Sequence, residues 1–169
     1  MQDTNKTLIL ALGNPILSDD GVAHEVADRL AKRLHSSCEK TSLQYDIIKS
    51  SAATMDIIPM LAGYNRLAVV DAVQLGNAPF GTVHRFGLAD FAPTIRPSSP
   101  HDINFATALQ LGKEWGYHIP ADVRIYGIEV KELSRFYENC TPEVTEKLDE
   151  IVENILTDLE AHQESKAKN

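Results

Sequence analysis

A strand, loop and helix pattern near the start of the chain constrains the fold more than any other feature. Leu8–Leu12 is a short, uninterrupted apolar run, which is typical of a strand covered on both faces, and Gly13–Pro15 ends it with turn-forming residues. After Asp19 and Asp20, apolar residues recur every fourth position across Val22–Leu34, which predicts an amphipathic helix. The two carboxylates are therefore expected at the carboxyl edge of a sheet, beside the start of a helix.

This acid pair allows two interpretations. Asp is a favoured helix N-cap, and an acid in a first helical turn is stabilised by roughly 0.3–1 kcal/mol. Two adjacent acids at the edge where open α/β sheets place their sites instead favour a functional role for Asp19 and Asp20. The loop contains neither GxGxxG nor a Walker-type sequence, and carboxylates repel phosphate, so a cation is the expected ligand.

Four further strands and three further helices follow from the apolar patterns. The third strand is expected to be parallel to the first, because a helix separates the segments, and the fourth to run antiparallel at an edge. The pattern thus predicts a three-layer α/β fold, in which helices flank both faces of a twisted, mostly parallel sheet of about five strands. The expected strands are Leu43–Ile48, Leu67–Val70, Thr82–Phe86 and Val123–Val130, and the helices are Met55–Ala62, one that follows His101, and Thr141–Leu159.

Size and charge limit the classes of function. The chain has 169 residues and a formal net charge of −8, which suits one domain, expected over residues 1–161 with a polar tail over 162–169. Nucleic acids and anionic membranes both require a basic surface, so neither is the expected partner. No apolar run approaches the ~20 residues of a membrane span, and the first residues, MQDTNKT, lack the apolar segment of a signal peptide. We therefore expect a cytoplasmic protein.

A third acid and a histidine are expected near the first acid pair. Asp71 follows the third apolar run, and parallel strands would bring it to the edge that carries Asp20. A proline-rich loop over 87–100 then leads to His101, where a helix begins, and that position favours the neutral imidazole that binds metals. Two carboxylates and one imidazole suit Ni²⁺ or Zn²⁺ and leave a coordination position open.

Nucleophilic catalysis by serine or cysteine is not expected. Cys38 and Cys140 match no metal or redox spacing, neither falls in a sheet-edge loop with an evident His–acid pair, and the chain has no GxSxG motif. No HExxH or paired-histidine motif fixes a metal site locally either. The proposed site therefore depends on the topology that brings its residues together.

Three motifs in order, GNPILSDDG, VVDAV around Asp71 and SPHD around His101, resemble the nickel-iron hydrogenase maturation endopeptidases. The resemblance covers about Leu8 to Leu159. It implies a cytoplasmic peptidase that removes a C-terminal extension from the hydrogenase large-subunit precursor after nickel insertion. It also implies that Asp20, Asp71 and His101 contact nickel, which the precursor carries and for which zinc can substitute, and that Asn14 shapes the first loop.

The chain departs from the family pattern at two places. Members often have Asp-Gly-Gly after the second strand, where this chain has Lys49-Ser50-Ser51, and many have glycine at the position of Ala23. The first departure concerns which large subunit is accepted, because that loop is thought to face the substrate. The three implied ligands are unaffected.

The sequence leaves several alternatives open. The acids and histidine could recognise nickel on the precursor, a metal could polarise the scissile carbonyl and activate water, or Asp20 or Asp71 could act as general base. A maturation chaperone that binds metal without cleaving is a second class of function. A receiver-type signalling domain is a third, with Mg²⁺ held by the acids and Lys131 nearby, although His101 would then have no role.

Overall fold

A computed structural model describes residues 6–37, 44–51, 55–91 and 102–167. In chain order these residues form β1 (Lys6–Leu12), η1 (Ser18–Gly21), α1 (Val22–Ser37), β2 (Gln44–Ser50), η2 (Met55–Ile57), α2 (Ile58–Leu61), β3 (Arg66–Val73), β4 (Val83–Gly87), η3 (Leu88–Phe91), α3 (Asp102–Glu114), β5 (Asp122–Glu129), α4 (Pro142–Thr145) and α5 (Leu148–Ala167), where η denotes a short 3-10 helix.

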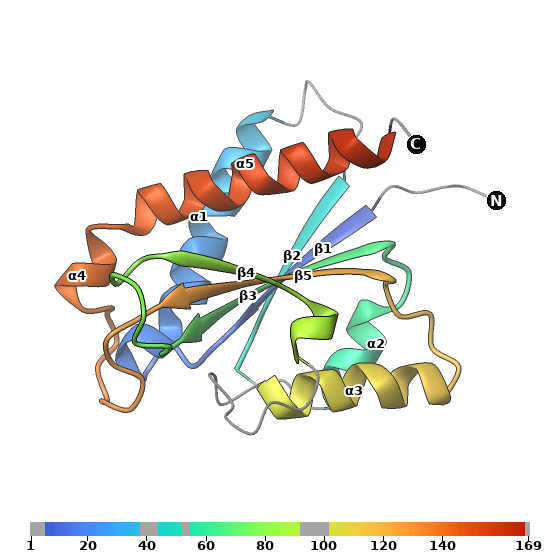
Figure 1. Cartoon of the computed structure of the whole chain (residues 1–169), viewed down its shortest axis with the longest axis horizontal. Helices are drawn as coiled ribbons and strands as arrows, with labels where there is room; N and C mark the ends of the chain where they lie inside the picture. The colour runs from blue at the N-terminus through green and yellow to red at the C-terminus, as the bar shows by residue number, and fades with distance from the viewer. Residues whose placement is uncertain (1–5, 38–43, 52–54, 92–101, 168–169) are drawn as a thin grey trace.

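The five strands form one sheet in the order β2-β1-β3-β5-β4. All neighbouring pairs are parallel except β4 and β5, which are antiparallel. Helices α1 and α5 cover one face of the sheet, and α2 and α3 cover the other (Figure 1). This arrangement confirms the predicted three-layer α/β fold, including the antiparallel strand at an edge.

Strand β1 is buried on both faces, as its unbroken apolar sequence predicted. Its side chains alternate between two cores, because successive residues of a strand point to opposite faces. Ile9 and Ala11 belong to the core under α1 and α5, whereas Leu8, Leu10 and Leu12 belong to the core over α2 and α3. Two filled cores fix the register of β1 and hence the place where its following loop begins.

The last helical region differs from the prediction. The sequence favoured one helix from Thr141, but the structure has α4 (Pro142–Thr145), a break, and then α5. Thr141 precedes α4 without forming a side-chain cap, because its hydroxyl donates to Asp19 instead. Helix α5 continues through His162, where the polar tail was expected to begin, and the domain boundary at residue 161 stays a prediction.

Two other segments also differ locally from the sequence pattern. The short helix expected over 55–62 is divided into η2 and α2, with Pro59 at the start of α2. The loop after β4 contains η3, and its remainder up to His101 lies outside the described residues. Within the described ranges, no helix combines the length and apolar composition that a bilayer crossing requires.

Candidate active site at the carboxyl edge of the sheet

The loop between β1 and α1 is folded tightly against its own end. Gly13 has a φ of +147°, and a Cβ atom there would lie 1.9 Å from the carbonyl oxygen of Asp20. A Cβ atom on Gly21 would lie 2.9 Å from Cα of Pro15. The two glycines are therefore required by close backbone contacts, which bring the start and the end of the loop together.

Asn14 organises this loop through three hydrogen bonds. Its side-chain Oδ1 accepts the N–H of Ile16 at 3.2 Å, and its backbone N–H donates to Oδ2 of Asp20 at 2.8 Å. The backbone carbonyl of Asn14 also accepts the N–H of Leu17. The role implied for Asn14, shaping the loop, is confirmed by these bonds.

The Asp20 carboxylate has one satisfied and one unsatisfied oxygen. The residue is only 4% exposed, and its Oδ1 atom is buried without a hydrogen-bond partner among the described residues. A buried anionic oxygen without a donor is unfavourable by several kcal/mol unless a cation or proton compensates it. This oxygen therefore fits a positively charged ligand, and the binding of a cation there stays a prediction.

Asp71 lies inside β3 rather than at its end, two residues before Val73. It is 4% exposed, and its Oδ1 atom accepts the backbone N–H of Ala72 at 2.8 Å. Because β1 and β3 are parallel and η1 packs against β3, the elements that carry Asp20 and Asp71 meet at the carboxyl edge of the sheet. The expected convergence of these two elements is therefore found.

Asp19 is not a helix cap. It is fully buried, and its carboxylate accepts the backbone N–H groups of Lys131, Glu132 and Thr141 at 2.6–3.1 Å, together with the Thr141 hydroxyl at 3.0 Å. The residue before η1, Leu17, makes no side-chain cap bond either. The cap interpretation was wrong because the donors come from a segment more than a hundred residues away, which local sequence cannot indicate.

The histidine of the predicted site, His101, lies outside the described residues. Within the part of the chain that the structure describes, no three His, Cys, Asp or Glu side chains are grouped as a metal site. The predicted ligand set of Asp20, Asp71 and His101 therefore stays a prediction.

Cys140 lies in the segment between β5 and α4, where its side chain is buried. Burial raises the pKa of its thiol to about 12, and the negative charges of Asp19 and Glu25 add to the effect. The thiol is therefore protonated at neutral pH and is a poor nucleophile. This agrees with the expectation that Cys140 has no catalytic role.

Glu129 is a buried carboxylate that the sequence patterns did not predict as functional. Its Oε1 atom accepts the N–H groups of Leu75 and Gly76 at 3.0 and 2.9 Å, and its Oε2 atom lies 3.0 Å from Nε2 of His84. These bonds tie the β3–β4 connection to the end of β5. The available signal was a single acid in the otherwise apolar segment IYGIEV.

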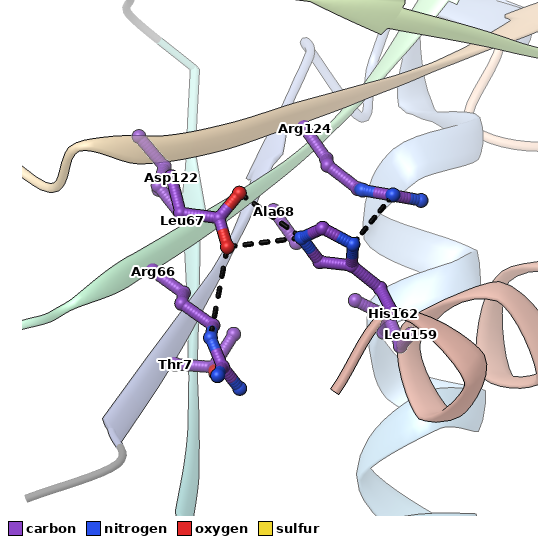
Figure 2. Close-up of a pocket in the computed structure, with 8 residues that line it drawn as sticks. All are labelled: Thr7, Arg66, Leu67, Ala68, Asp122, Arg124, Leu159 and His162. Carbon is purple, nitrogen blue, oxygen red and sulfur yellow. Dashed lines mark hydrogen bonds and ion pairs between the residues drawn. The ribbon is translucent and has the colours of Figure 1, made fainter. Parts of the chain in front are cut away.

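A second polar cluster lies at the opposite, amino-terminal edge of the sheet (Figure 2). His162 of α5 joins Asp122 to Arg124: Arg124 Nη2 donates to Nδ1 at 2.6 Å, and Nε2 lies 2.9 Å from Asp122 Oδ2. Because arginine is only a donor, the imidazole must donate to Asp122 through Nε2. The residues that line this pocket are Thr7, Arg66, Leu67, Ala68, Asp122, Arg124, Leu159 and His162.

This second polar cluster is structural. Its hydrogen bonds between His162 and Asp122 attach the end of α5 to β5, far from the edge that carries Asp20 and Asp71 (Figure 1). Thr7 Oγ1 and Arg66 Nη1 are buried there without a partner among the described residues, an arrangement that an internal water would satisfy.

Comparison with known proteins identifies the family. Residues 25–158 match the family HycI, described as hydrogenase maturation protease. The chain belongs to the hydrogenase maturation protease family. The match includes Asp71 and His101 and begins after Asp20. No match was found among curated protein sequences.

Solved structures of this family have the same fold. The hydrogenase maturating endopeptidase HybD from E. coli superposes with a TM-score of 0.69 at 19% identity and covers 93% of both chains. The [NiFe] hydrogenase maturation protease HybD from Thermococcus kodakarensis gives a TM-score of 0.70 at 23% identity, over 90% of this chain and 97% of that one. HycI from T. kodakarensis KOD1 gives 0.64 at 18% identity, over 91% and 92%.

Membership of the hydrogenase maturation proteases confirms the predicted family and the prediction of a peptide hydrolase. It leaves the receiver-type alternative without support. The ammonium group of Lys131, the lysine that this alternative uses, is paired with Glu143; this hydrogen bond raises the pKa of Lys131, and the nearby charge of Asp19 adds to the effect.

Proposed function

We propose that this hydrogenase maturation protease removes the C-terminal extension of a nickel-iron hydrogenase large-subunit precursor after nickel insertion. Asp20, Asp71 and His101 contact the nickel that the precursor carries, so that only a loaded precursor is cleaved. The observation that carries this proposal is the buried Oδ1 atom of Asp20, which has no partner in the described part of the chain and calls for a cation at the edge where β3 brings Asp71.

The nickel ion is part of the substrate in this scheme. Zinc or another divalent ion could occupy the same oxygen and nitrogen donors, because affinity follows ligand type as well as geometry. Hydrolysis adds water across the scissile peptide bond: the water oxygen bonds to the carbonyl carbon, the C–N bond breaks, and the amine receives a proton. Asp20 or Asp71 acts as the general base through a carboxylate oxygen that does not contact the metal, which makes the reaction dependent on aspartate.

Two features support an aspartate-dependent reaction over a cysteine-dependent one. Asp20 and Asp71 are on elements that meet at the sheet edge, whereas Cys140 is buried with its pKa raised to about 12. The cytoplasm, where the precursor would be met, stays a prediction.

The test is the intact mass of the large-subunit precursor, with and without nickel, after incubation with this protein. We expect loss of a C-terminal peptide from the nickel-loaded sample alone. Cleavage of both samples would contradict nickel recognition while keeping the peptidase, and binding without cleavage would favour the chaperone alternative.

Single substitutions then test which residues belong to the active site. Asp20→Asn, Asp71→Asn and His101→Ala are each expected to slow cleavage by about 100-fold or more, the range of a lost acid–base or metal contact. Asp149→Asn is the matched control, because that carboxylate is 90% exposed on α5. Normal cleavage by any of the three site variants would remove that residue from the proposed site.

A further inference from the structure

Three large apolar side chains are exposed on two loops: the first connects β1 to α1 and carries Asp20, and the second connects β5 to α4. Ile16 is 48% exposed, Phe136 is 79% exposed and Tyr137 is 55% exposed. Arg135 is exposed next to them, and its guanidinium lies 6.0 Å from the centre of the Tyr137 ring. We call Ile16, Arg135, Phe136 and Tyr137 the aromatic lip.

The two loops are joined by their backbones. The Tyr137 N–H donates to the Ile16 carbonyl at 3.1 Å, and the Ser18 N–H donates to the Tyr137 carbonyl at 2.7 Å. Leu17 and Tyr137 form a parallel β-bridge. The side chains of the lip therefore project from a fixed backbone, although they come from distant parts of the chain.

The second loop is held in place by hydrogen bonds to the buried Asp19 and by hydrogen bonds within the loop itself. The Asp19 carboxylate binds backbone N–H groups at both ends of the segment, at Lys131 and Thr141. Within the segment, Glu132 Oε1 accepts from the backbone N–H groups of Ser134 and Arg135. A surface that is ordered before binding loses little conformational entropy when a partner docks.

The lip is directly connected to the candidate active site. Ile16 N–H donates to the Asn14 side chain, and Asn14 N–H donates to the Asp20 carboxylate, so two successive hydrogen bonds link Ile16 to Asp20. A chain bound near Asp20 would therefore pass close to the lip.

The exposure of these side chains is not explained by folding. Phe136 and Tyr137 are outside both cores of the sheet. Aromatic residues and arginine are the side chains most enriched in the energetic centres of protein interfaces. Such residues next to a peptidase site fit a polypeptide partner.

We propose that the aromatic lip is the docking surface for the segment of the hydrogenase precursor that adjoins the scissile bond. This inference rests on the proposed function. The segment places an aliphatic or aromatic side chain against Phe136 and Tyr137, close to the bond that is cleaved. An acidic group on the same segment would pair with Arg135.

The test compares cleavage kinetics of the nickel-loaded precursor by wild type and by the double variant Phe136→Ala/Tyr137→Ala. We expect KM to rise about 10-fold or more while kcat at saturating precursor changes less than about 2-fold, because docking energy is lost away from the reacting atoms. The matched control is Trp115→Ala/Tyr117→Ala, another exposed aromatic pair just beyond α3, which should keep both constants. Circular dichroism and thermal melting verify that both variants are folded.

Two further measurements complete the test. A photo-reactive amino acid at position 136 should crosslink to the precursor within a few residues of its cleavage site. An unchanged KM in the double variant, or crosslinks far from that site, would overturn the docking proposal although the wild type still cleaves. A change in molar mass on substitution would overturn it in favour of contact between two copies. Failure of the wild type to cleave any precursor would instead contradict the proposed function.

Discussion

Asp19 and Thr141 are joined by two hydrogen bonds: the Thr141 N–H donates to Asp19 Oδ1 at 2.6 Å and the Thr141 hydroxyl donates to Oδ2 at 3.0 Å. With the N–H groups of Lys131 and Glu132, these bonds fasten the segment after β5 to the loop that carries Asp20. The neighbouring acids therefore differ: Asp19 joins the two segments through its hydrogen bonds, whereas Asp20 keeps one buried oxygen without a donor among the described residues.

Asp19→Ala is expected to reduce the free energy of unfolding by about 3 kcal/mol or more, because three backbone donors lose their buried acceptor. Chemical denaturation measures the change. Asp149→Ala, at a 90% exposed position, should stay within about 0.5 kcal/mol of wild type. A loss for Asp19→Ala no greater than the ~1 kcal/mol of a helix cap would contradict this account.

Gly13→Ala is expected to abolish processing, because the new Cβ would collide with the Asp20 carbonyl and displace the loop. Gly63→Ala is the matched control. Gly63 also has a positive φ, of +90°, but nothing lies within 4 Å of its Cβ position, so only backbone strain of about 1–3 kcal/mol is expected. Cleavage assays with folded samples distinguish the two, and normal cleavage by Gly13→Ala would show that the close contact is dispensable.

Cys140 is expected to resist thiol reagents in the native state. Burial, with the charges of Asp19 and Glu25, raises its pKa to about 12, so almost no thiolate is present at pH 8. In a Cys38→Ser background, reaction with a chromogenic disulfide should be slow until denaturant is added, and Cys140→Ala should keep cleaving precursor. Rapid labelling of Cys140 in the folded protein, accompanied by loss of cleavage, would instead support a mechanism that uses the cysteine.

Asp158 is expected to make folding sensitive to acid. Burial alone would raise its pKa, but hydrogen bonds from Tyr126 and Arg124 outweigh this effect and hold the pKa below the ordinary 3.8. Asp158 therefore stabilises the fold fully above that ordinary value, and the contribution is lost as pH falls through the lower folded-state pKa.

Denaturation of wild type and Asp158→Asn across pH tests this sign. The difference in unfolding free energy should be constant near neutral pH and should shrink below about pH 4. Glu160→Gln, an exposed neighbour on α5, is the control. A difference that grows on acidification would contradict the depressed pKa.

Sequence periodicity was sufficient for most of the architecture. The unbroken apolar run predicted β1, and the repeat at every fourth residue predicted α1. A strand that is buried on both faces is apolar throughout, whereas a helix that is buried along one stripe is apolar only at helical spacing. The parallel direction of β1 and β3 then brought the elements of Asp20 and Asp71 to one edge. The predicted end of β3 was wrong. Asp71 lies inside β3, where its carboxylate accepts the backbone N–H of Ala72.

The sequence by itself determined the layers of the fold, the acids at the sheet edge and the family. Tertiary structure alone decided that Asp19 binds the 131–141 segment, that Glu129 joins His84 to the β3–β4 connection, and that Ile16 lies beside Tyr137. The physical reason is the distance along the sequence between the residues that interact. Strand and helix patterns arise from neighbouring residues, whereas a buried carboxylate takes its donors from whichever segment packing brings near, and that choice leaves no local period in the chain.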